Sequence, residues 1–191
     1  MGILSLVNLL AVLCHKSLFL GPIFFYLVEK KYYFIQIGDV NFYRFLQKIG
    51  LSPNKSRTIG EVEIPEEYFL DFLRGHFDGD GCFYYYWDPR WRSSLMFYTS
   101  FVTASQKHVL WLRKRITQAL GLKGHITKGK NDKDCYQLKY AKRETLVLLP
   151  KLYANPASLY LGRKHLKFKR VLDIMKEISA GGETGRHAIL R

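Results

Sequence analysis

The sequence predicts an α+β domain with the order helix, two strands, helix, two strands, helix, helix. Apolar residues recur at helical spacing in some segments, and runs of aromatic and β-branched residues fill others. The order is arranged around residues 68–82, where an apolar helix-like run ends in Asp78-Gly79-Asp80-Gly81 and a strand-like run follows at once. Mixed orders of this kind are typical of helices packed on one face of an antiparallel sheet.

The composition favours a folded protein with a polyanionic partner. The chain has 191 residues, of which 48% are hydrophobic, so it can bury a core and is not disordered throughout. The net charge of +14 favours DNA, RNA or an anionic membrane surface. Three cysteines lie far apart, without disulfide or metal-ligand spacing. This pattern suits a reducing compartment, and we expect a cytoplasmic location.

Residues 1–30 differ from the rest of the chain. Two apolar blocks, 2–13 and 18–28, are separated by a polar run that contains Lys16. Each block is shorter than the ~20 residues that span a bilayer. Together they would bury Lys16 at a cost in free energy. We expect a buried or poorly formed helix, and a membrane anchor over residues 2–28 is the second alternative.

The sequence of residues 31–64 predicts a strand, a helix and a loop, in that order. The run at 32–37 is aromatic and β-branched, which favours a strand. Asp39 can cap a helix over 42–49, whose apolar residues share one face. A polar, basic loop that contains Lys55 follows.

The main domain is predicted over residues 65–178. Pro65 and the two acids after it start the central helix. The later elements are strands at 82–87 and 94–103, a helix from the Ser105 cap to Leu120, strands at 124–129 and 135–140, and helices at 143–152 and 164–178. The glycine-rich tail, 179–191, is expected to be flexible.

Asp78 and Asp80 fall at the C-terminal end of the central helix. The helix dipole disfavours negative charge there, so we expect a cation or a polar backbone partner to compensate. We interpret the stretch as a helix-packing surface that presents a metal-binding acid. A calcium-type loop is an alternative, but Pro89 stands where its twelfth position needs glutamate. An ordinary helix-to-strand turn is another, since Asp and Gly are turn residues.

Three pieces of the N-terminal part parallel the C-terminal part in the same order. The paired segments are 33–37 with 134–138, 45–49 with 148–152, and 54–56 with 163–165. We infer two repeats from this order. The first repeat lacks its front half, because no Asp-x-Asp helix precedes the strand that begins near Lys31.

The segment Leu73–Gly81, LRGHFDGDG, resembles the motif of the LAGLIDADG homing endonuclease family. The resemblance extends over residues 31–178, and the order αββαββα is similar to that family's half-domain. It implies a complete repeat at 65–178, a remnant of a first repeat at 31–64 and a divergent or truncated segment at 1–30. It also implies a nuclease of an intron- or intein-associated mobile genetic element, which hydrolyses double-stranded DNA with Mg²⁺ or another divalent cation.

The resemblance also implies roles for individual residues. These are metal binding by Asp80 and Gly79, helix-interface contacts by Gly75 and Asp78, and catalysis by Asp80, Lys164 and Lys55. Ser105 or Gln106 falls near the family's water-orienting residue. Such roles fit phosphodiester hydrolysis, because a carboxylate-held metal activates water and neutralises phosphate charge.

The four strands of such a half-domain would lie in the DNA major groove. Alternation then turns Phe83, Tyr85 and Trp87 toward the helices and their neighbours toward the DNA. The expected phosphate or base contacts are Tyr84, Tyr86, Arg90, Arg92, Tyr98, Ser100, Thr127, Lys128, Gln137 and Lys139. Such binding weakens steeply with salt.

Two further interpretations follow from the single acidic motif. A second copy of the chain, as a homodimer, would complete a two-acid site. Alternatively, the scaffold binds DNA or intron RNA without cleaving it, as a decayed enzyme or a splicing helper would.

Overall fold

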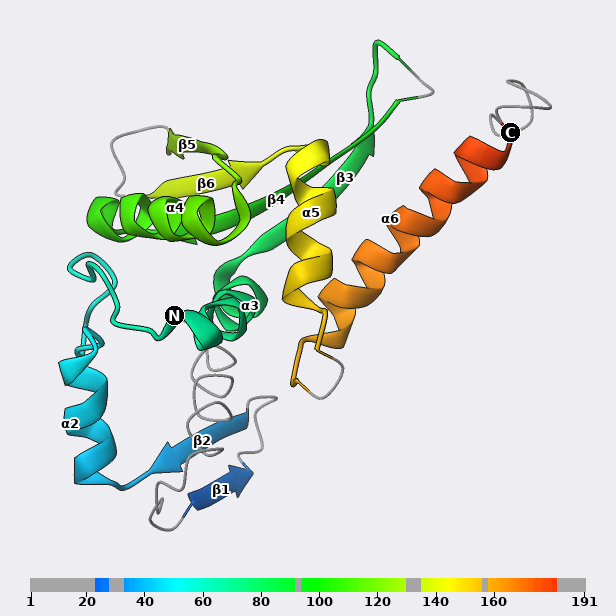
Figure 1. The fold of residues 1–191 in the computed structure, drawn as a ribbon. Helices are drawn as coiled ribbons and strands as arrows, with labels where there is room; N and C mark the ends of the chain where they lie inside the picture. Colours follow the sequence, from blue (N-terminus) through cyan, green and yellow to red (C-terminus); the bar gives the residue numbers. More distant parts are fainter. Residues whose placement is uncertain (1–22, 28–32, 92–93, 130–134, 156–157, 182–191) are drawn as a thin grey trace.

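The computed structural model describes residues 23–27, 33–91, 94–129, 135–155 and 158–181 (Figure 1). Its centre is a four-stranded antiparallel sheet with the strand order β3-β4-β6-β5. The strands are β3 (Cys82–Trp87), β4 (Leu95–Thr103), β5 (His125–Lys128) and β6 (Tyr136–Tyr140). The helices are α3 (Phe69–Asp80), α4 (Gln106–Leu120), α5 (Lys142–Leu152) and α6 (Gly162–Gly181), and a 3₁₀ turn, Glu66–Tyr68, precedes α3.

The predicted order of elements from residue 65 onward is confirmed. Helix α4 shows why local sequence signals were enough to predict where a helix begins and ends. The Ser105 side chain accepts a hydrogen bond from the His108 backbone amide at the N-terminus. Gly121 ends the helix in the left-handed region, with φ of 71°. Helix α6 begins two residues before the expected start at 164 and extends beyond 178.

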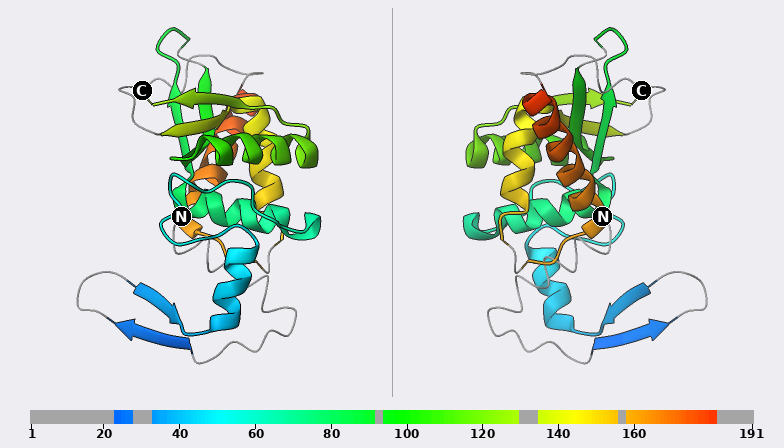
Figure 2. Two further views of the ribbon diagram at one scale, coloured as in Figure 1. Left: turned by 90° about the vertical axis from the view of Figure 1, so that its left-hand side faces the viewer. Right: turned by 90° about the vertical axis from the view of Figure 1, so that its right-hand side faces the viewer.

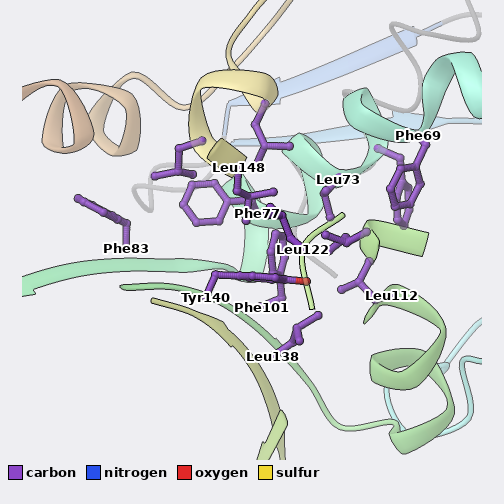
Figure 3. Close-up of a cluster of buried hydrophobic side chains, with 14 of the residues drawn as sticks. Phe69, Leu73, Phe77, Phe83, Phe101, Leu112, Leu122, Leu138, Tyr140 and Leu148 are labelled. Carbon is purple, nitrogen blue, oxygen red and sulfur yellow. The ribbon is translucent and has the colours of Figure 1, made fainter. Parts of the chain in front are cut away.

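One hydrophobic core lies between the sheet and the helices. Alternation along the strands directs one set of side chains toward α3, α4 and α5. Figure 3 shows this core, in which the fully buried residues include Phe69, Leu73, Phe77, Phe101, Leu112, Leu138, Tyr140 and Leu148. Each such large side chain contributes roughly 1.5–3 kcal/mol when buried. The other face of the sheet is not covered by these helices.

Trp87 was expected to face the helices, and it does lie on the same side of the sheet as its cross-strand partner Leu95, but it is not buried. Its side chain is 41% exposed, whereas Phe83 on the same side of β3 is 3% exposed. The hairpin of β3 and β4 extends past the helices (Figure 1). Leu95, directly opposite Trp87, is 1% exposed, so the core reaches this level of the sheet, and Trp87 stays partly exposed at the hairpin end of the edge strand β3.

The N-terminal part contains a second, smaller sheet. Strands β1 (Ile23–Leu27) and β2 (Tyr33–Ile37) form an antiparallel hairpin, and α2 (Val40–Lys48) follows. The helix expected over residues 18–28 is wrong at Ile23–Leu27. This run is aromatic and β-branched, and pairing with β2 satisfies its backbone groups.

The order hairpin then helix occurs in both parts of the chain, as β1-β2-α2 and as β5-β6-α5. Both figures place the N-terminal hairpin on the far side of α3 from the four-stranded sheet (Figures 1 and 2). The two-repeat interpretation and its boundaries stay a prediction.

The apolar block at 2–13 and the end of the tail at 182–191 lie outside the described residues. Within the described segments, no helix is both long and apolar enough to cross a bilayer.

Candidate functional site

The two aspartates at the end of α3 have different surroundings. Asp78 is 1% exposed, and its carboxylate accepts hydrogen bonds from the Tyr153 hydroxyl at 3.0 Å and the Leu161 backbone amide at 2.9 Å. Asp80, the last residue of the helix, is exposed. Residues two apart on an α-helix point to nearly opposite sides, about 200° apart. The Asp78 carboxylate is therefore engaged in hydrogen bonds inside the protein, and the Asp80 carboxylate is the accessible one.

The cation expected beside this helix end is Lys164. Its ammonium donates hydrogen bonds to the backbone carbonyls of Phe77 and Gly81, both at 2.5 Å. The residue is only 9% exposed. Burial lowers the pKa of Lys164, while Asp78 and Asp80 act in the opposite direction. A cation at the C-terminus of α3 is favourable because the carbonyl dipoles point toward it.

Helices α3 and α6 exchange these contacts reciprocally. Lys164 comes from the first turn of α6 and binds the C-terminal carbonyls of α3. Asp78 comes from α3 and accepts from Leu161, the residue just before α6, where negative charge is favourable. We call the pair Asp78 and Lys164, with these contacts, the α3–α6 clamp. It fixes the helix end that carries Asp80.

Further contacts bind α3 to the α5–α6 connection. Arg74 is 4% exposed and donates to the carbonyls of Leu152 and Leu159, each at 3.2 Å. Its guanidinium also pairs with Asp71 at 2.6 Å. Sequence reasoning missed this role. The signal was present, since Asp71, Arg74 and Asp78 are polar residues at helical spacing in an otherwise apolar helix.

Several implied roles concern residues near this region. Gly75 is buried and Gly79 is half-buried. Lys55 is half-buried in the turn after α2, where its backbone carbonyl accepts from Thr58 and Ile59. The interface role of Gly75, the metal-binding role of Gly79 and the catalytic role of Lys55 stay predictions.

Ser105 and Gln106 were expected near a water-orienting position. The Ser105 hydroxyl donates to the Ile59 carbonyl at 2.5 Å and accepts from the His108 amide at 3.3 Å. Its hydroxyl is therefore engaged as a helix cap, and the residue is 2% exposed. Gln106 is exposed, and its amide oxygen accepts from the Tyr136 hydroxyl at 3.5 Å.

The oxygen atoms at the end of α3 are of the chemical type that binds divalent cations. Asp80 offers a carboxylate and Gly79 a backbone carbonyl, and oxygen ligands of this type suit Mg²⁺. No cluster of three or more His, Cys, Asp or Glu side chains occurs within the described part of the chain. A two-acid site would need its second carboxylate from outside the described residues, or from a second copy.

The structure gathers most of the predicted DNA contacts on the face of the sheet opposite the helices, which we call the open face. The register Cys82↔Ser100↔Lys139↔His125 forms one row across it, and this row begins just after Asp80. The predicted contacts on the open face are Tyr84, Tyr86, Tyr98, Ser100, Thr127, Gln137 and Lys139. Ser100 is only 4% exposed. Lys128 lies on the other side of its strand, because it follows Thr127 directly.

Three tyrosines of the open face stack on one another. The Tyr98 ring lies between Tyr84, at 5.3 Å and 20°, and Tyr86, at 6.2 Å and 12°. A hydrogen bond with Tyr86 raises the pKa of Tyr98, and burial raises the pKa of Tyr84. Both hydroxyls therefore stay protonated at neutral pH and can donate hydrogen bonds.

The tip of the β3–β4 hairpin presents a basic and an aromatic side chain. The Asp88 carboxylate accepts from the Arg90 backbone amide at 2.9 Å and pairs with its guanidinium at 3.2 Å. These contacts lower the pKa of Asp88. Arg90 is 82% exposed and Trp91 is 70% exposed. Trp91 was not among the predicted contacts, and Arg92 lies outside the described residues.

Comparisons with known proteins bear on the fold. No family model and no curated protein matches this chain. The LAGLIDADG meganuclease I-AabMI, bound to uncleaved DNA, matches with a TM-score of 0.52 and 14% identity over 93% of this chain and 80% of that one.

Two further solved structures match less of the chain. The archaeal intron-encoded homing endonuclease I-Vdi141I, complexed with DNA, matches with a TM-score of 0.45 and 17% identity over 59% of this chain and 72% of that one. The homing endonuclease I-TnaI matches with a TM-score of 0.43 and 19% identity over 61% of this chain and 76% of that one. The match to I-AabMI confirms the predicted fold class: this chain has the fold of a LAGLIDADG homing endonuclease.

Proposed function

We propose that this protein is homing-endonuclease-like: it binds double-stranded DNA through the open face and hydrolyses phosphodiester bonds with a divalent cation held at Asp80. The observation that carries the proposal is the position of Asp80. Its carboxylate is exposed at a helix end that the α3–α6 clamp fixes, and the next strand leads directly onto the open face.

Charge and shape support double-stranded DNA as the partner. The chain carries a net charge of +14, and basic proteins gain affinity for DNA by releasing its counterions. A sheet face that helices leave uncovered can enter the major groove, which admits a β-ribbon. Lys139 and the tip residue Arg90 bring positive charge to two separate places along this face.

The residues at the end of α3 would act on the phosphodiester together. Asp80 and the Gly79 carbonyl would hold the cation, which supplies an activated water and neutralises phosphate charge. Lys164 interacts electrostatically with Asp80 and donates hydrogen bonds to the carbonyls at the end of α3. An ammonium has one more N–H than these two carbonyls use, and it would be available to a phosphate oxygen.

The exposed carboxylate leads to a test by substitution. Purified protein with Mg²⁺ should nick or cut a supercoiled plasmid library that carries randomised inserts. Asp80→Asn should abolish cutting and leave DNA binding in a gel-shift assay intact. Asp173→Asn is the matched control, because its carboxylate is 64% exposed further along α6, and it should cut like the wild type. Undiminished cutting by Asp80→Asn would overturn the metal-binding role.

A second function has one observation in its favour. The described residues supply one accessible acid at the site and no cluster of three metal-ligating side chains. We therefore propose, as the alternative, a module that binds DNA or intron RNA without cleavage. Wild-type protein that binds the library but never cuts it, at any protein concentration, would support this alternative over both the nuclease and a cutting homodimer.

A further inference from the structure

The open face is divided into two chemically different halves. On β3 and β4 it presents Tyr84, Tyr86, Met96, Tyr98 and Val102, which are aromatic or apolar, together with Cys82 and the buried Ser100. On β6 and β5 it presents Gln137, Lys139, Thr127 and His125, which are polar or basic. Among the described residues of β3 and β4 that point to this face, none carries a charge.

The apolar half is partly accessible, and its rings contact one another. Tyr86 is 43% exposed and pairs with Met96 across the strands, and Met96 and Val102 are half-buried. The stack of Tyr84, Tyr98 and Tyr86 holds the rings in place. The apolar half therefore offers tyrosine rings and hydroxyls, together with the Met96 thioether and the Val102 methyl groups.

This surface offers less to an unpaired base or a phosphate than to an apolar group. Binding of single strands relies on aromatic faces that are free to stack on bases, and here the stack covers both faces of the Tyr98 ring and one face each of the Tyr84 and Tyr86 rings. Phosphate binding draws on cations, N–H donors and hydroxyls, and of these the apolar half offers tyrosine hydroxyls but no charged side chain. Its Met96 and Val102 side chains suit an apolar ligand group.

The major groove of double-stranded DNA contains such a group, the C5-methyl of thymine. The polar half matches the other base edges, since Gln pairs with adenine N6 and N7 and Lys pairs with guanine O6 and N7. Gln137 lies directly opposite Val102 in the register, so the two halves meet along the line between β4 and β6. A duplex lying across both halves would present successive base pairs to different chemistry.

We propose that the β3–β4 half of the open face reads thymine methyl groups in the major groove, while Gln137 and Lys139 read adenine and guanine edges in the adjoining half-site. This inference rests on the proposed binding of double-stranded DNA. It adds a base preference and the residues that set it.

Deoxyuridine tests the inference directly, because it differs from thymidine only in lacking the methyl group. Sites would be selected from a randomised double-stranded pool, and each thymine of the selected site would then be replaced singly by deoxyuridine. One block of thymines should each lose about fourfold in affinity for the wild type, the value of one buried methyl group. The loss should persist at raised salt, unlike a phosphate contact.

Substitutions identify which residues cause the discrimination between thymine and deoxyuridine. Val102→Thr keeps the side-chain shape but replaces a methyl by a hydroxyl, and together with Met96→Ser it should abolish the discrimination against deoxyuridine. Val147→Thr is the control, because Val147 is 43% exposed on α5, away from the open face, and it should behave as the wild type. Gln137→Ala should relax selection only at adenine positions. Thermal melts check that each variant is folded.

The outcomes separate the two proposals. Tight binding to duplex DNA with equal affinity for thymine and deoxyuridine at every position would overturn the inference and leave the proposed function standing. Discrimination that survives in the Met96→Ser, Val102→Thr double variant would also overturn it. Absence of binding to any duplex would overturn both. Stronger binding to single strands than to duplex would replace groove reading by base stacking.

Discussion

At the scale of single residues, Asp78 and Asp80 illustrate how neighbouring carboxylates acquire different roles. Asp78 is buried with two hydrogen-bond donors, and Asp80 is exposed at the end of the helix. Asp78→Asn leaves an amide where the donors need an acceptor, so we expect a loss of about 1–3 kcal/mol in the free energy of unfolding.

Asp80→Asn should change the free energy of unfolding by less than Asp78→Asn, by about 0–1 kcal/mol in either direction, because Asp80 is exposed and interactions of exposed charges are weak. Urea unfolding of the two variants side by side makes the comparison. Equal destabilisation by both substitutions would contradict the division of roles between the acids.

Lys164 makes a second prediction at this scale. Lys164→Met leaves the buried carbonyl of Phe77 and the partly buried carbonyl of Gly81 without this donor, which should cost about 1–3 kcal/mol of stability. Lys176→Met, on the same helix and 79% exposed, is the control and should stay within about 0.5 kcal/mol of the wild type. A Lys164→Met variant as stable as this control would show that the clamp contributes nothing.

His76 predicts a pH dependence of stability. It is 5% exposed and stacked on His108 at 5.6 Å, and burial, with His108 adding to it, lowers the pKa of His76 from 6.5 to about 4. Asp80 opposes this shift weakly. Between pH 6.5 and about 4, the His76 imidazole is therefore protonated in the unfolded chain but not in the folded chain. The contribution of His76 to the free energy of unfolding is fully present above pH 6.5 and is lost as the pH falls toward about 4.

The full loss is on the order of 3 kcal/mol, from ~1.4 kcal/mol per pKa unit. His76→Phe should flatten the stability curve between pH 6.5 and 4. Unfolding free energies measured across this range provide the check. A variant whose pH dependence matches the wild type would contradict the assignment.

At the scale of elements, the sequence was sufficient where local chemistry decides. The Ser105 cap and Gly121 bounded α4, and alternation placed Tyr84, Tyr86 and Tyr98 on the open face. It failed at Ile23–Leu27, because strand formation there depends on pairing with β2. It also missed the contacts of Arg74 with the α5–α6 connection, since these join residues 78 or more positions apart.

The turn after α2 carries a prediction at this scale. Gly50 has φ of 96°, and a Cβ there would meet the Glu61 carbonyl oxygen at 2.6 Å. Gly50→Ala should therefore destabilise the protein by about 1–2 kcal/mol or more, through left-handed strain and the clash. Gly60→Ala is the matched control, because a Cβ at Gly60 meets nothing within 4 Å. Thermal unfolding distinguishes the two variants, and equal melting temperatures would contradict the reported turn.

At the scale of the whole molecule, the proposed DNA binding depends on positive charge placed around the open face. Arg90 is 82% exposed at the hairpin tip, where a phosphate contact carries no base information. Arg90→Ala should weaken binding to all sequences and reduce the slope of log K against log salt by about 1. Fluorescence anisotropy over a salt series measures this slope. An unchanged slope with lowered affinity would rule out a phosphate contact.

The central claim is that Asp80, fixed by the α3–α6 clamp, holds a divalent cation at bound DNA. Electron paramagnetic resonance of Mn²⁺ tests it without requiring cleavage. Titration of Mn²⁺ into the complex with a duplex from the selection should show tightly bound ion for the wild type and for Asp173→Asn, and loss of that ion for Asp80→Asn with DNA still bound. Equal Mn²⁺ binding by Asp80→Asn and the wild type would contradict the account.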